Sequence, residues 1–122
     1  MVRLSYWSML LLVVLATRTM PQRAETVSIE EATKLAVQWY TDGEKAGPTG
    51  SPQRLELQTQ AIELLEQVVG VDRSYGQASF LLGMMRQQSG DAQRAFDAFA
   101  LSVAADPSNA DAYNNMGHAI TI

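Results

Sequence analysis

The chain has 122 residues, of which 47% are hydrophobic, and a formal net charge of −4, so it can form one small domain with a modest core. Its nine basic residues form no run that would line one face, which excludes a surface built for nucleic acid. The lack of cysteine excludes disulfides and thiolate metal sites.

Residues 1–16 have the composition of a signal peptide or a short membrane anchor. A short basic start precedes a largely apolar stretch over 4–16. That stretch is shorter than the ~20 apolar residues of a spanning helix and matches the core of an export signal. Cleavage is expected before Thr17, although two arginines soon after it weigh against this, and a buried N-terminal helix is the alternative. We therefore expect a secreted, periplasmic or secretory-lumen protein, with membrane anchoring as the other outcome.

Residues 17–27 are polar and aperiodic, which is typical of a linker. Ser28 and Glu31 then form a capping box, which predicts a helix over 29–40. Residues 41–50 contain three glycines and a proline, so a loop is expected there. The expected apolar face of this helix consists of Ala32, Leu35, Ala36 and Trp39.

A second helix is predicted to start at Pro52, with Ser51 as its cap, and to end at Val69 or Gly70. Proline suits the first turn of a helix, where its missing N–H would have no partner. The apolar stripe of this helix consists of Leu57, Ala61, Leu64, Leu65, Val68 and Val69.

The next pair of helices has clear turn signals. A helix is predicted over 77–88, Gly90 can adopt the left-handed turn conformation, and Asp91 can cap a second helix over 92–105. Pro107 then prevents that helix from continuing.

Residues 109–122 begin another helix that has no following partner. An apolar face without a partner indicates either a longer chain or self-association through this unpaired C-terminal helix. The residues expected on that face are Ala112, Met116, Ala119 and Ile120.

The sequence repeats itself at an offset of 34 residues. Small, glycine, apolar and turn residues return together at this spacing, which is the length of one helix-turn-helix unit. Because one hairpin alone cannot bury its apolar stripe, the repeat predicts an all-α fold of stacked antiparallel hairpins. The matched pairs are Ala61 and Ala95, Leu65 and Phe99, Val69 and Val103, Asp72 and Asp106, Ser74 and Ser108, Ala78 and Ala112, Leu82 and Met116, and Gly83 and Gly117.

These residues resemble the tetratricopeptide repeat (TPR) family. Leu82-Gly83 matches the Leu-Gly pair of its first helix, Gly90-Asp91 the turn, Ala95 with Phe99 the second helix, and Asp106-Pro107 the stop. The resemblance implies a short right-handed α-solenoid over 28–122. Its first repeat is degenerate and contains the 41–50 loop, its second covers about 76–109, and its third is incomplete at 110–122. Close helix crossings are expected at Gly83 and Gly117.

The resemblance also implies a concave groove that binds a peptide or a helix of a partner protein. Phe80 and Met84 would form an adaptable apolar platform there, with packing between repeats as the alternative, and Asn114 would bind a partner's backbone. The residues predicted to bind the partner are Tyr40, Gln77, Phe80, Met84, Gln87, Asn114 and His118. Thr33, Val37 and Asp111 are expected beside them.

No arrangement of residues points to catalysis. His118 is the only histidine and has no neighbouring ligand set, and the glutamates fit a cap and a solvated helix face. The segment 43–50 lacks the ending of a phosphate loop. We therefore expect a non-enzymatic interaction module or scaffold with no cofactor, no metal and no evident small-molecule substrate. The alternative is the N-terminal, substrate-presenting repeat region of a larger secretory-pathway enzyme, of the glycosyltransferase or hydroxylase type.

Overall fold

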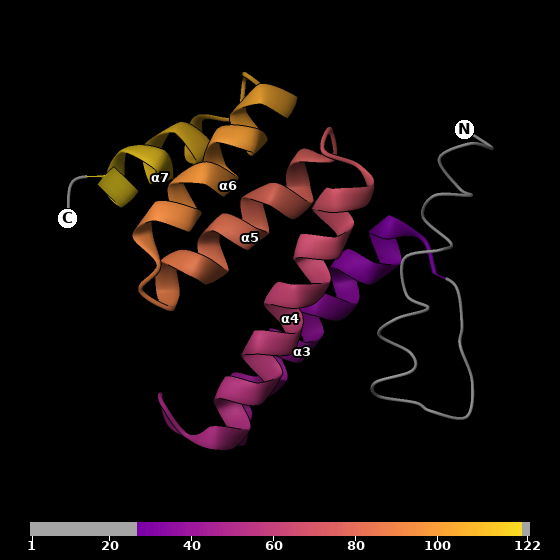
Figure 1. The fold of residues 1–122 in the computed structure, drawn as a ribbon, viewed down its shortest axis with the longest axis vertical. Helices are drawn as coiled ribbons and strands as arrows, with labels where there is room; N and C mark the ends of the chain where they lie inside the picture. The colour runs from indigo at the N-terminus through magenta and orange to yellow at the C-terminus, as the bar shows by residue number, and fades with distance from the viewer. Residues whose placement is uncertain (1–26, 121–122) are drawn as a thin grey trace. The chain divides into compact units, whose positions relative to one another are not determined.

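The structure, a computed structural model, describes residues 27–120, and its regular secondary structure over that range is entirely α-helix (Figure 1). This confirms the predicted fold class. The predicted signal or anchor (1–16) and nearly all of the predicted linker lie outside the described residues. The helices are α3 (Ile29–Ala46), α4 (Pro52–Val71), α5 (Gly76–Gln88), α6 (Ala92–Ala105) and α7 (Ala110–Ile120).

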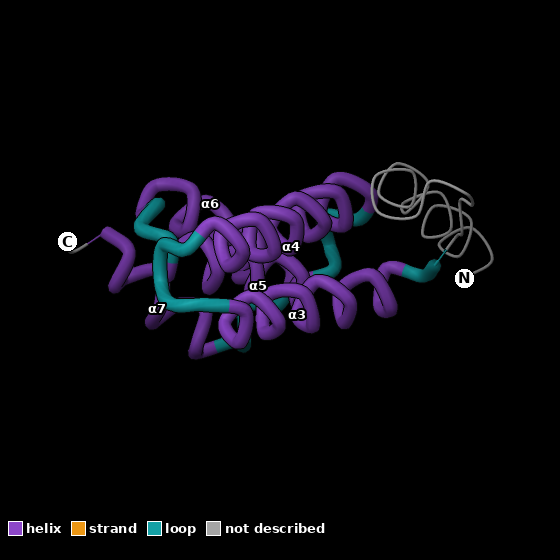
Figure 2. The backbone as a smooth tube through the Cα atoms, turned by 90° about the horizontal axis from the view of Figure 1, so that it is seen from below, coloured by secondary structure: helices purple, strands orange, loops and turns teal. Residues whose placement is uncertain are grey.

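The chain divides into two compact units at Val71–Asp72. In the first unit α3 packs against α4, and in the second unit α6 packs against both α5 and α7. Short loops join the helices of each unit (Figure 2). Consecutive helices therefore form packed pairs, as expected of a helical repeat.

The start of α3 has the predicted capping box. The Glu31 amide donates to Ser28 Oγ, and the Ser28 amide donates to Glu31 Oε1, each over 3.1 Å. Thr33 differs from its expected place beside the groove. It is buried, and its hydroxyl donates to the Ile29 carbonyl over 2.7 Å. Its side chain is therefore not available to a partner.

The predicted 41–50 loop is wrong over its first half, because α3 continues to Ala46. Gly43 lies buried where α4 crosses closely. A Cβ at this position would lie 3.1 Å from Gln58 Cγ, 3.2 Å from the Arg54 carbonyl oxygen and 3.3 Å from Leu57 Cβ. Glycine costs an isolated helix about 1 kcal/mol, but here it permits the contact between helices, so tertiary packing overrides local propensity.

α4 begins at Pro52 as predicted, and the Arg54 amide donates to Ser51 Oγ over 3.4 Å. Most of its predicted stripe is buried. Leu57 is the exception, because it stays partly exposed. The buried residues of the stripe are Ala61, Leu64, Leu65, Val68 and Val69.

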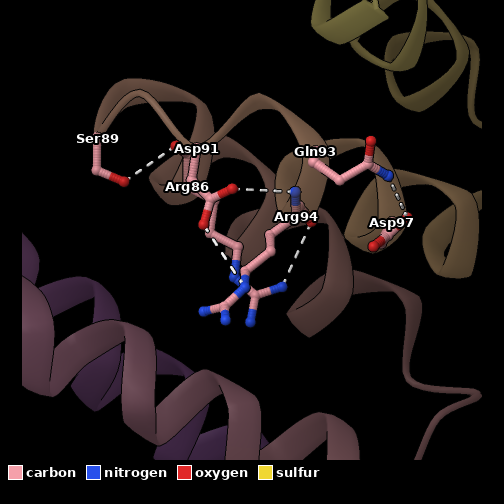
Figure 3. Close-up of polar contacts among 6 residues, drawn as sticks. All are labelled: Arg86, Ser89, Asp91, Gln93, Arg94 and Asp97. Atoms are coloured by element: carbon pink, nitrogen blue, oxygen red, sulfur yellow. Dashed lines mark hydrogen bonds and ion pairs between the residues drawn. The ribbon is translucent and has the colours of Figure 1, made fainter.

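The turn between α5 and α6 is closed by local hydrogen bonds (Figure 3). Gly90 has a φ of 88°, the left-handed conformation predicted for it. Asp91 caps α6 by accepting from the Arg94 amide over 3.2 Å, and its other oxygen lies 3.7 Å from Arg94 Nε. The Arg86 guanidinium donates to the Arg94 carbonyl over 3.4 Å, which joins the two helices across the turn.

The close crossing predicted at Gly83 is confirmed. A Cβ at Gly83 would lie 2.6–2.9 Å from ring atoms of Phe99, closer than atoms can approach. The matching expectation for Gly117 is wrong, because no described atom outside the neighbouring backbone of its own helix lies within 4 Å of a Cβ built there. The Phe99 ring of α6 packs against Gly83. Within the described residues, no side chain packs against Gly117 in the same way.

The same polar turn precedes α5 and α7. Asp72 Oδ1 accepts from the amide of Ser74 over 3.0 Å and from its hydroxyl over 2.6 Å. Asp106 Oδ1 accepts from the amide of Ser108 over 3.1 Å and from its hydroxyl over 2.6 Å. The 34-residue repeat of the sequence therefore has a counterpart in local structure.

The exposed surface of α7 is smaller than predicted. Ala112 and Ala119 are buried, and Met116 packs against the core cluster of the second unit. Ile120 lies one turn after Met116, near the same face, but it is the last residue of α7 and stays exposed. It is 65% exposed, and Tyr113 is 47% exposed. Self-association through this helix stays a prediction.

Candidate partner-binding site

Six of the seven residues predicted to bind a partner lie in the second unit, on α5 and α7. The seventh, Tyr40, lies in the first unit on α3. Tyr40 is partly buried, and its pKa is raised above 10.0, mainly by burial and further by the Glu44 carboxylate, while Arg54 lowers it. Of the residues expected beside the site, Val37 and Asp111 are exposed.

Phe80 and Met84 are half-buried residues of α5 that pack against the core of the second unit. The ring of Phe80 lies 5.9 Å from that of Phe99, tilted by 58°. Asn115 of α7 donates from Nδ2 to Met84 Sδ over 3.5 Å, which links α7 to α5. Both residues therefore make the packing contacts that were the alternative interpretation, and both keep part of their surface exposed.

The polar members of the predicted set are more accessible. Gln77, Asn114 and His118 are exposed, and Gln87 is partly buried. Gln77 Oε1 accepts from the hydroxyl of Tyr75 over 3.2 Å. Exposed amides beside half-buried apolar side chains can combine hydrogen bonding with apolar contact, which is how many protein interfaces are composed.

A pocket of about 330 Å³ opens between the start of α5, the end of α6 and the turn before α7. Two of the predicted residues, Gln77 and Phe80, line it. Sequence reasoning missed the rest of its lining, because these residues come from helix ends and a turn, which helical periodicity does not connect. The lining residues are Ser74, Gly76, Gln77, Phe80, Ser102, Ala105, Asp106 and Asn109.

Internal hydrogen bonds hold the floor of this pocket. The Gly76 carbonyl accepts from the Ser79 hydroxyl over 3.1 Å and from the Ser102 hydroxyl over 3.2 Å. Both serines are buried, so each hydroxyl has the partner that burial requires. A Cβ on Gly76 would lie 3.1 Å from Ala105 Cβ, so glycine lets the start of α5 approach the end of α6.

The rim of the pocket carries a fixed negative charge. Hydrogen bonds from the side chain and backbone of Ser108 hold the pKa of Asp106 below its ordinary value of 3.8. The Asp106 carboxylate therefore stays ionised at neutral pH.

No family model matches the sequence, and no curated protein matches it. Across residues 27–120, no group of histidine, aspartate and glutamate side chains is arranged to hold a metal ion. Within the same range, no helix combines the length and the apolar character needed to cross a membrane.

Proposed function

We propose that the second unit is a protein-interaction module that binds a peptide or a helix of a partner through the surface formed by α5 and α7. The observation that carries this proposal is the position of Phe80, which packs on the core cluster and also lines the pocket beside Gln77. An apolar wall anchored in the core, with exposed amides around it, offers a preformed surface, which lowers the entropy cost of binding.

We further propose that the hairpins belong to a TPR-type right-handed solenoid. Two observations in the second unit support this extension. The turn at Asp106 repeats that at Asp72, and Phe99 packs over Gly83 as the Leu-Gly signature implies.

The test is a selection of binders from a random 12-residue peptide library on the full chain, followed by affinity measurements on variants. Gln77→Ala/Asn114→Ala removes two exposed amides of the proposed surface. We expect this double variant to lower the affinity for the selected peptides about tenfold, because each lost hydrogen bond is worth about 0.5–1.5 kcal/mol.

The matched control is Gln53→Ala/Gln93→Ala, which removes two exposed amides from α4 and α6. It should leave affinity unchanged, and circular dichroism should show the same helix content in both double variants. Equal weakening by both pairs, or no enriched peptide, would overturn the proposed function.

A further inference from the structure

The pocket beside Phe80 carries negative charge only. Among its lining residues only Asp106 is ionised, and no lysine or arginine contributes to it. Its other polar groups are neutral, and Phe80 and Ala105 supply apolar surface. A ligand group that fits this composition is apolar along its length and positively charged at its end.

The Asp106 carboxylate has one oxygen available. Both hydrogen bonds from Ser108 go to Oδ1. Within the described part of the chain, no hydrogen bond or ion pair involves Oδ2. These bonds fix the carboxylate in place and leave Oδ2 as an acceptor for a ligand.

The helix ends at the pocket do not favour an anion. The start of α5 carries a partial positive charge, but the end of α6 at Ala105 carries the opposite partial charge. With these two ends opposed, the full charge of Asp106 decides the sign. The net charge of −4 over the whole chain also favours basic partners at long range.

We propose that this pocket receives a lysine or arginine side chain of the bound peptide. The aliphatic stem lies beside Phe80 and Ala105, and the charged group binds Asp106 Oδ2. The volume of about 330 Å³ is sufficient for one such side chain. A cation near the Phe80 ring would gain a further attraction to its face. This inference rests on the proposed function and specifies which kind of peptide side chain the pocket recognises.

The experiment titrates the full chain with blocked Gly-X-Gly tripeptides, where X is lysine, arginine, norleucine or glutamate. Backbone amide NMR shifts of Gly76, Gln77 and Asn109 report on the pocket. We expect the lysine and arginine peptides to shift these signals, with affinity about fivefold above the norleucine peptide, as an exposed ion pair can provide. The glutamate peptide should bind most weakly.

Two matched variants separate the local charge from the net charge. Asp106→Asn and Asp72→Asn each remove one charge from the same kind of turn and keep an oxygen for the serine bonds. Asp72 does not line the pocket, although Ser74, which donates to it, does, so Asp72→Asn removes a charge just outside the lining. We expect Asp106→Asn alone to abolish the preference for lysine over norleucine.

Equal effects of the two variants, or norleucine or glutamate binding as well as lysine, would overturn this inference. The proposed function would survive those results, because peptides would still bind the α5–α7 surface. If no tripeptide shifts any pocket signal, the inference fails. The library selection then decides the proposed function independently.

Discussion

Glycines at equivalent places in the repeat meet different surroundings, and this difference gives a test at the scale of single residues. A methyl group added at Gly83 would lie within 2.9 Å of the buried Phe99 ring, whereas at Gly117 it would meet no described atom outside the neighbouring backbone of its own helix within 4 Å. The sequence pattern treats the two positions alike. Only the packed structure separates them, because the atoms that crowd a glycine come from another helix.

Gly83→Ala should lower the free energy of unfolding by about 1–3 kcal/mol through overpacking. Gly117→Ala should raise it by up to about 1 kcal/mol, because alanine favours a helix and meets no obstacle. Urea unfolding followed by circular dichroism measures both. A stabilising Gly83→Ala would show that the helix crossing at Gly83 is misplaced, and a destabilising Gly117→Ala would contradict the open space at Gly117.

The hydrogen bonds at Asp106 give a prediction on pH dependence. Hydrogen bonds from Ser108 hold the pKa of the Asp106 carboxyl below 3.8 in the folded chain. These bonds therefore stabilise the fold fully at a pH above the pKa that the carboxyl has in the unfolded chain, and their contribution is lost as the pH falls through the lower pKa of the folded chain. Ser108→Ala should therefore raise the pKa of Asp106 toward 3.8, as measured by carboxyl ¹³C NMR. Ser74→Ala, which alters the equivalent turn at Asp72, should leave the pKa of Asp106 unchanged.

At the scale of elements, the two helices that follow the repeated turn begin differently. Asn109 caps α7, because its side chain accepts from the Ala112 amide over 3.0 Å. Tyr75, at the matching place before α5, provides no side-chain cap. Its hydroxyl instead donates to Gln77. The start of α5 is therefore the less stabilised of the two.

Tyr75→Asn should stabilise the second unit by about 1 kcal/mol, reduced by the loss of the tyrosine hydrogen bond, and Asn109→Tyr should destabilise it by a similar amount. Thermal unfolding of the two variants measures these opposite shifts. If neither substitution changes the melting temperature, the side-chain cap does not make one helix start more stable than the other.

Helix starts and turns could be predicted from the sequence because their causes are local. Ser28, Ser51, Gly90 and Asp91 act on atoms only a few residues away. The continuation of α3 past Tyr40 could not be predicted, because Gly43, which indicates a loop in the sequence, lies instead within α3 at a close contact with α4. Local chemistry sets where helices begin, and packing between helices decides how far this one extends.

At the scale of the whole molecule, the 34-residue repeat connects sequence, structure and proposed function. It predicted the paired helices and placed Gln77 and Phe80 together on α5, where they line one pocket. The rest of the pocket, including Asp106 and Asn109, was missed, because a recess between helix ends depends on how the helices meet. Helical periodicity identifies faces of single helices, so it supplied only part of the candidate site.

We propose above all that the α5–α7 surface binds a segment of another protein. Isotope-filtered NMR of the labelled chain with a library-selected peptide measures this directly, through contacts between protons of the two molecules. We expect contacts from the peptide to Gln77, Phe80 and Asn114. Contacts confined to α3 and α4, or to Gln93 and Asp97 on α6, would contradict this proposal.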